Sequence, residues 1–135
     1  MENDSEKFCL QWNDFAENIS GTFKEFWKDE DFFDVTLACG DEQIQAHKII
    51  LSACSNFFRS VLRRHQHSHP LLYLNSVKYS DLVSLLNFMY HGQVNVKKED
   101  LNSFLATAQV INSIQCINVF RFRQEVGDFN TAVHY

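Results

Sequence analysis

Three histidines in one short segment are the first residues in this sequence whose spacing suggests chemistry. His65, His67 and His69 alternate in the stretch RRHQHSHP. Imidazole nitrogens bind zinc, but a structural zinc site needs four ligands held in fixed positions. A histidine tract in a loop supplies no fixed fourth ligand and is only compositional support for metal binding. We therefore expect no metal site and no cofactor.

A nucleophilic catalyst needs a base and an orienting partner at defined geometry. Ser52 lies close to His47 in sequence, but the chain has only four glycines, and neither a nucleophile elbow nor a phosphate loop is present. No ligands are spaced around His47 either, so we interpret it as a structural histidine whose ring forms local hydrogen bonds. The sequence therefore predicts no catalytic residue and no enzyme.

The cysteines show no spacing typical of a disulfide framework or a metal site. They stand at positions 9, 39, 54 and 116 without close pairing, and three of them lie inside apolar patterns. Cysteines of this kind behave as small buried hydrophobes in intracellular proteins. We expect reduced and buried thiols.

The overall charge bears on the class of partner. The net charge is -5 and the pI is near 5.6, which is not the electrostatic footprint of a nucleic-acid-binding domain. No apolar run approaches the roughly 18 residues that a membrane-spanning helix needs. We therefore expect a protein that is soluble inside the cell, with no membrane contact and no direct nucleic-acid binding.

The elements that position these residues are densest in residues 33–59, where the periodicity changes three times. Residues 35–39 alternate with the period of two that is typical of a strand, and Gly40 follows as a turn residue. Residues 43–47 alternate again, which predicts an antiparallel return strand. From Lys48 the apolar spacing becomes helical. This stretch predicts a hairpin that leads into helices.

Two apolar patterns precede the hairpin. Phe8, Leu10 and Trp12 alternate with polar or small residues, which predicts a short strand with no sequence neighbour to pair with. A helix should follow, capped by Asn13 or Asp14, with one apolar stripe of Phe15, Ile19, Phe23, Phe26 and Trp27. The stripe could pack on its own core, as most amphipathic helices do. Thirteen phenylalanines in 135 residues nevertheless indicate more apolar surface than a monomer hides, which favours self-association.

The remaining elements are predicted from shorter signals. Ser52 and Ser55 can cap short helices, and residues 71–74 form an apolar run that we interpret as a buried strand beside the hairpin. A helix should end at Gly92, another should begin near Lys97, and a last helix should cover residues 110–117. We expect a flexible N-terminus at residues 1–7, one domain at 8–124 and a tail or linker at 125–135.

Several separated motifs also resemble a known family. FDVTL and AHKIILSACSNFFR resemble the BTB (POZ) domain, a protein-interaction fold, and FCLQWN, HPLLYL and LLNFMYHGQVNV are similar to the insect tramtrack group of that family. The resemblance covers most of the chain. It implies an α+β fold in which a helical cluster packs on a small, mostly antiparallel sheet and the N-terminal strand is exchanged between two subunits.

The resemblance also implies which residues form the interface. It assigns strand exchange to Phe8, Leu10 and Trp12, the helix interface to Phe15, Ile19, Phe23 and Phe26, and a buried charged pocket to Asp34 and Lys48. The alternative is that Asp34 and Lys48 are exposed, at a strand start and a helix N-terminus. If the two residues form the pocket, Asp34→Asn should weaken folding or dimerisation by leaving Lys48 unpaired.

The function implied is a protein-protein interaction module of a nuclear transcription regulator or chromatin architectural protein. The module would form a homodimer, with higher-order or heterotypic association with other BTB proteins, corepressors or architectural cofactors, and so raise the effective concentration of linked DNA-binding regions. It would act as part of a longer chain or as a short form working through partners. The alternative is a substrate adaptor for a cullin-type ubiquitin ligase, but SVLRRHQHSHP has arginines and histidines where such adaptors carry an acid.

Overall fold

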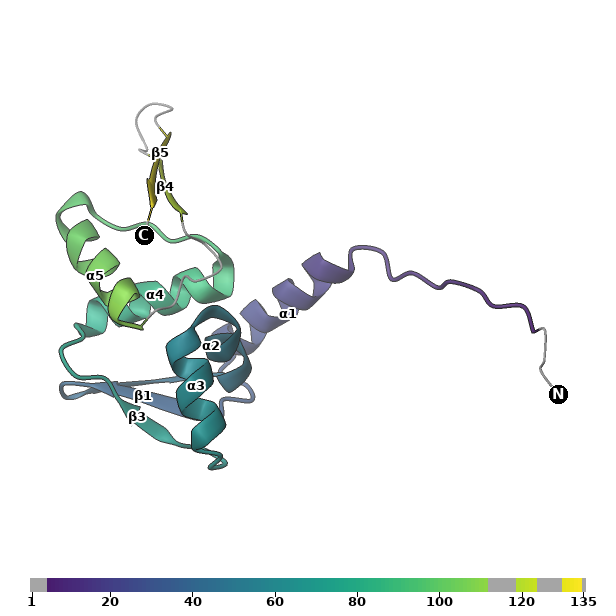
Figure 1. Cartoon of the computed structure of the whole chain (residues 1–135), viewed down its shortest axis with the longest axis horizontal. Coiled ribbons are helices and arrows are strands. Elements are labelled where there is room, and N and C mark those ends of the chain that lie inside the picture. Colours follow the sequence, from purple (N-terminus) through teal and green to yellow (C-terminus); the bar gives the residue numbers. More distant parts are fainter. Residues whose placement is uncertain (1–4, 112–118, 124–129, 135) are drawn as a thin grey trace.

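The predicted hairpin is present and forms the middle of the sheet. Strand β1 (Val35–Cys39) pairs antiparallel with β2 (Glu42–Ala46), and Val35 lies opposite Ala46. Gly40 in the turn has a φ of 58°, a left-handed conformation that glycine adopts without strain. These elements come from a computed structural model that describes residues 5–111, 119–123 and 130–134 of the chain (Figure 1).

The third strand, β3 (Leu71–Tyr73), lies parallel to β1, so the strand order is β2-β1-β3. The chain reaches β3 through two helices, and such a crossover returns it in the direction of β1. The sheet is therefore mixed, where the sequence suggested mostly antiparallel pairing. The prediction of a buried strand was wrong for Leu71 and Tyr73, which are exposed because alternate side chains of a strand lie on opposite faces of the sheet, whereas Leu72 and Leu74 pack against the core.

The crossover helices are α2 (Lys48–Cys54) and α3 (Asn56–Arg64). Ser55 caps α3 as predicted: its hydroxyl accepts a hydrogen bond from the backbone N–H of Phe58 at 3.1 Å. The same hydroxyl donates to the carbonyl of Ile111 at 2.7 Å, at the end of α5 (Leu101–Ile111). The cap therefore also ties α3 to α5. Ser52 is not a cap, because it lies inside α2.

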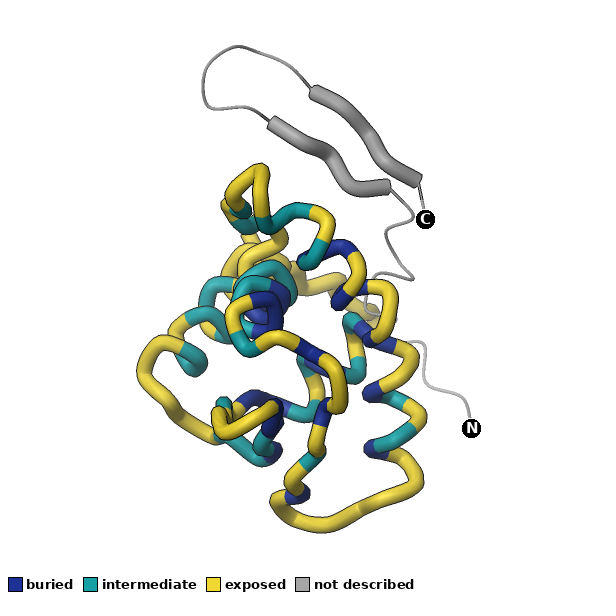
Figure 2. Tube along the Cα trace, turned by 90° about the vertical axis from the view of Figure 1, so that its left-hand side faces the viewer, coloured by how far each residue is buried: buried dark blue, intermediate teal, exposed yellow. Residues whose placement is uncertain are grey.

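The central helix of the domain is α4 (Tyr79–His91), which contacts α1, α2 and α5. Leu82, Leu85 and Leu86 of α4 are fully or almost fully buried. The helix ends at Gly92, as predicted, with a φ of 78°. The chain then runs without regular structure to the 3-10 helix η1 (Lys98–Asp100), which leads into α5. Figure 2 marks the buried positions, which come from the sheet and from these packed helices.

Helix α1 (Phe15–Lys28) differs from the other helices, because none of its residues is buried. Figure 1 shows α1 projecting from the other helices, with the segment before it running further outward. Asp14 occupies the N-cap position with a φ of 58°, and its side chain forms no capping hydrogen bond, contrary to the predicted cap. Residues 5–12 have no regular structure in the single chain. A strand there needs a partner strand that this chain does not bring to it.

Two further strands follow α5. Strand β4 (Val119–Arg123) pairs antiparallel with β5 (Asn130–His134). The sequence pattern predicted neither strand, and β5 falls in the segment expected to be a tail. The domain limits at 8 and 124 stay a prediction. Most of the predicted last helix, residues 112–117, lies outside the described residues. Among the residues that are described, no helix is both long and apolar enough to cross a membrane.

Candidate dimer interface

The N-terminal segment presents its large apolar side chains to solvent. Phe8 is 81% exposed, Leu10 is 92% exposed and Trp12 is also exposed. Burying such side chains is worth about 25 cal/mol per Å² of apolar surface, so an extended segment that leaves three of them in water is poised for a partner surface. Trp12 makes one ring contact, an edge contact with Phe15 at 5.1 Å between ring centroids. This contact joins the segment to α1.

The apolar stripe of α1 continues the exposed surface. Phe15 and Ile19 in its first half are exposed, and Phe23 and Phe26 in its second half are partly buried. Phe23 and Phe26 touch edge to face, with centroids 6.2 Å apart. The structure thus places the four predicted helix residues on one face, which we call the α1 face (Phe15, Ile19, Phe23 and Phe26). The alternative, a stripe packed on its own core, is not what the single chain shows.

The last residue of the stripe holds α1 to the rest of the domain. Trp27 stacks on Tyr90 of α4 with ring centroids 4.6 Å apart and ring planes within 5° of parallel. Trp27 also lies 5.8 Å from the ring of His91. Offset or parallel aromatic contacts of this kind add roughly 0.5–1.5 kcal/mol beyond the area they bury. The C-terminal turn of α1 is therefore anchored, while its N-terminal half remains uncovered.

A defined turn ends α1 and adds one residue to the exposed surface. The N–H of Asp31 donates to the carbonyl of Phe26 at 2.9 Å, and the N–H of Glu30 donates to that of Trp27 at 3.3 Å. This is the Schellman pattern, with Glu30 in the left-handed position at a φ of 59°. Phe32 follows, 72% exposed, with its ring 5.0 Å from that of Phe26. The sequence analysis missed Phe32, although it stands beside the helix stripe in the printed sequence.

His47 is a structural histidine, as predicted. Its Nε2 lies 2.7 Å from the carbonyl oxygen of Asp31, and its Nδ1 lies 2.5 Å from the hydroxyl of Tyr90. A carbonyl only accepts, so Nε2 carries the proton and Nδ1 accepts from the phenol. The backbone N–H of His47 donates to the same phenol oxygen at 3.0 Å. This network fastens the turn after α1 to α4.

Burial raises the pKa of Tyr90 well above its ordinary value, and the nearby charge of Asp34 acts in the same direction, while the hydrogen bond from the His47 backbone opposes both. The phenol therefore stays neutral and keeps its proton for Nδ1 of His47. This pKa shift has the sign expected for an acid whose charged form is costly to desolvate.

Asp34 and Lys48 are brought together, but through the main chain. The backbone N–H of Lys48 donates to Oδ1 of Asp34 at 2.7 Å, which satisfies the first turn of α2. The Lys48 ammonium instead donates to the carbonyl of His67 at 2.5 Å. The prediction that Asp34→Asn leaves Lys48 unpaired therefore needs correction, because the Lys48 ammonium has another acceptor. A charged pocket at a dimer interface stays a prediction.

The histidine tract and the cysteines take separate places. His69 hydrogen-bonds Thr36 through Nε2 at 2.8 Å, and within the described part of the chain no three His, Cys, Asp or Glu side chains gather as metal ligands. Cys39 is buried, and burial followed by the Glu42 charge raises the pKa of its thiol. Cys54 is partly buried, and Cys116 lies outside the described residues. Cys9 is exposed, so the expectation of a buried thiol was wrong there, because residues 5–12 are all exposed in the single chain.

Comparison with known proteins identifies the family. Residues 23–119 match the BTB/POZ domain. The Drosophila melanogaster Broad-complex core protein isoforms 1/2/3/4/5 are 45% identical over 109 residues, which is 81% of this chain and 15% of that protein. The Drosophila melanogaster Longitudinals lacking protein-like is 43% identical over 108 residues, covering 80% of this chain and 85% of that protein. This chain therefore spans a small part of one relative and most of the other.

The fold agrees with a solved structure. The BTB domain of zebrafish PATZ1 superimposes with a TM-score of 0.68 at 24% sequence identity, covering 79% of this chain and 88% of that one. The α+β arrangement of five α-helices on a small mixed sheet is thus the BTB fold. The chain belongs to the BTB/POZ family of protein-interaction domains, which is not enzymatic, and it is closely related to the Drosophila tramtrack group.

Proposed function

We propose that this chain is the homodimerisation module of a nuclear transcription regulator or chromatin architectural protein. The observation that carries the proposal is α1, a helix of 14 residues with an aromatic stripe and no buried residue. A helix gains most of its stability in proteins from packing an apolar face. The α1 face therefore needs a second surface, and interface cores are enriched in aromatic residues.

A second copy of the chain supplies that surface in a symmetric way. In a twofold dimer the same patch serves both subunits, so the α1 face of one protomer would pack on that of its partner. The exposed segment at residues 5–12 extends beyond α1 and is long enough to reach across such an interface. Exchange of this segment would bury Phe8, Leu10 and Trp12, which are exposed in the single chain.

The family relationship supports the nuclear part of the proposal. Dimerisation would bring two DNA-binding regions together, and linkage raises the local concentration of the second region once the first is bound. Larger assemblies, and mixed ones with related BTB domains, corepressors or architectural cofactors, would extend the same effect. Those regions are not identified in these 135 residues.

An avidity experiment tests this function. The chain is fused to one weak DNA-binding module, and affinity is measured for probes with one and with two sites. The two-site probe should bind at least about a hundredfold more tightly. Ile19→Glu, which puts a charge on the α1 face, should abolish that advantage, while Lys24→Glu, off the apolar stripe, should keep it. Equal affinity of the unaltered fusion for both probes would contradict the proposal.

A further inference from the structure

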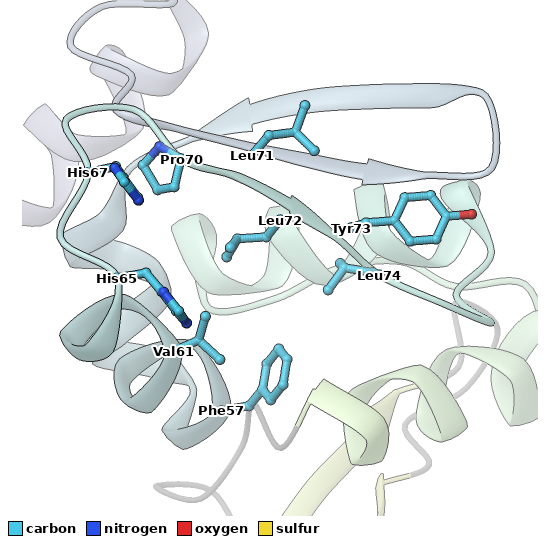
Figure 3. A pocket seen from close by; sticks show the side chains of 9 residues that line it. All are labelled: Phe57, Val61, His65, His67, Pro70, Leu71, Leu72, Tyr73 and Leu74. Carbon is cyan, nitrogen blue, oxygen red and sulfur yellow. The ribbon is translucent and has the colours of Figure 1, made fainter.

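A second surface, separate from the α1 face, lies between α3 and the open edge of β3. A hollow of about 390 Å³ is lined there by Phe57 and Val61 of α3, by His65 and His67, and by residues 70–74. Figure 3 shows the Phe57 and Val61 side chains directed towards β3, with both histidines at one end of the hollow. Most of the lining side chains are apolar, and the imidazole nitrogen atoms lie at that end.

One wall of the hollow is a strand with a free side. Residues of β3 that pair with β1 alternate along the strand: the carbonyl of Pro70 accepts from Thr36, and the N–H of Leu74 donates to Ala38. The main-chain groups of Leu71 and Tyr73 therefore face away from β1. In the described part of the chain β3 is the outermost strand of its sheet. An open edge beside an apolar hollow is the geometry that accepts an added strand.

The chain segment that contains this edge carries charged side chains of one sign only. The first 42 residues contain twelve of the 17 acidic residues, whereas residues 43–80 contain no Asp or Glu. That stretch carries five cations, namely Lys48, Arg59, Arg63, Arg64 and Lys78. The sequence analysis overlooked this segregation because it argued from the net charge of -5.

The cations of this stretch do not all lie on the same side of α3. Arg64 is exposed and immediately precedes His65, whereas Arg63 lines a different hollow together with Arg59 and Gln66. The Lys48 ammonium is fixed against the carbonyl of His67 at 2.5 Å. An acidic group brought to this end would meet the Lys48 ammonium, while the nearby Asp34 carboxylate already accepts from the backbone N–H of Lys48.

We propose that the β3 edge binds an extended segment of a second protein in which apolar residues alternate and one end is acidic. Its main chain would pair with Leu71 and Tyr73, alternate side chains would enter the hollow beside Phe57, and its acidic end would lie at Lys48, Arg64 and the histidines. The chain's own N-terminal residues have a similar composition, but the proposed dimer already uses residues 8–12 in strand exchange. The surface does not include the α1 face.

The binding test uses a short fluorescein-labelled peptide in which Val and Thr alternate after two Glu residues. Fluorescence anisotropy against the whole chain should show saturable binding that weakens as salt is raised. A matched peptide with two Lys residues in place of the two Glu should bind at least about tenfold more weakly. The double variant Lys48→Ala, Arg64→Glu should remove this preference, while Arg63→Glu, at a residue that lies in a different hollow on another side of α3, should leave it nearly unchanged.

The pairing with β3 is tested through the main chain. Tyr73→Pro removes the outward N–H but leaves the bond from Leu74 to Ala38 in place, and proline is tolerated on the free side of an edge strand. It should reduce peptide affinity at least about tenfold, whereas Tyr73→Ala, which keeps the N–H, should reduce it less. Amide hydrogen exchange of residues 71–73 should slow when the peptide binds.

Three results would overturn the proposal. The first is equal binding of the Glu and Lys peptides, or binding of neither. The second is exchange protection at α1 instead of β3. The third is a fall in the mass of the free assembly on Tyr73→Pro, since the edge would then be occupied by another copy of this chain. None of these results depends on the experiments that test dimerisation through the α1 face.

Discussion

Trp27 of α1 lies flat on Tyr90 of α4, with ring centroids 4.6 Å apart and planes 5° apart. Tyr90 in turn hydrogen-bonds His47, whose ring reaches the carbonyl of Asp31 just after α1. The C-terminal end of α1 is therefore held to its own domain by Trp27, before the turn, and by the contact of Asp31 with His47, after it. The apolar residues at the N-terminal end of α1 are exposed to solvent and available to a partner.

Removing the stack should loosen α1. Trp27→Ala deletes a partly buried aromatic side chain and should lower the free energy of unfolding by about 2 kcal/mol. Trp27→Phe keeps a stacked ring and should lose less than half of that. Urea denaturation followed by circular dichroism measures both. Equal losses for the two variants would mean that the stack on Tyr90 does not anchor the helix.

For the stability of the fold, the hydrogen-bond acceptor of the Asp34 side chain should matter more than the charge of that side chain. Because Oδ1 accepts from the backbone N–H of Lys48 at 2.7 Å, Asp34→Asn keeps an acceptor and should cost less than about 1 kcal/mol of unfolding free energy. Asp34→Ala leaves that N–H unsatisfied and should cost about 1–3 kcal/mol. Thermal unfolding of the two variants separates the cases. A larger loss in the Asn variant would restore the charged-pair interpretation.

The phenol of Tyr90 should make stability fall at alkaline pH. Its pKa is raised in the folded state, chiefly by burial, so the neutral form stabilises the fold at every pH below the unfolded value near 10.0. That contribution is lost as pH rises above this value. Tyr90→Phe should cost about 1–3 kcal/mol at pH 7 by removing the His47 hydrogen bonds.

The pH dependence separates this effect from general alkaline denaturation. The stability gap between the natural protein and Tyr90→Phe should be constant from pH 7 to about 9 and narrow above about 10. Chemical denaturation at a series of pH values gives the gap directly. A gap that widened with pH would show that the Tyr90 proton is not held by the fold.

The turn after α1 contains a strained residue that can be relieved. Glu30 has a φ of 59°, where a side chain costs about 1 kcal/mol and glycine does not. Glu30→Gly should therefore raise the free energy of unfolding by up to about 1 kcal/mol. Glu25→Gly, inside the helix, should lower it by about the same amount. Melting temperatures that moved the same way for both would contradict the Schellman assignment.

Local sequence patterns predicted most of the helices and strands of the fold. Alternation in residues 35–39 and 43–47 predicted β1 and β2, and the spacing from Phe15 to Trp27 predicted α1, because each pattern reflects its own element. The edge position of β3 could not be predicted in this way, because it depends on which strands flank it in space. The exposure of Leu71 and Tyr73 was missed as well, because an apolar run does not show that one face of the strand lies away from the core.

The candidate site was predicted in outline only. The α1 face follows from the helical stripe, but the split between an anchored Trp27 and an exposed Phe15 depends on where Tyr90 lies. The link between Asp34 and Lys48 was predicted as a charge pair, and it runs through a backbone N–H that side-chain chemistry does not reveal. Phe32 was missed, because its contact with Phe26 depends on left-handed residues in the turn.

The measurement that tests the central claim most directly is absolute mass in solution by light scattering, on the whole chain and on a version that begins at Asn13. We expect the whole chain to be a dimer or larger across a hundredfold range of concentration. The shortened version, without Phe8, Leu10 and Trp12, should dissociate on dilution. A monomer at every concentration would contradict the proposed dimer and leave the α1 face to a different partner.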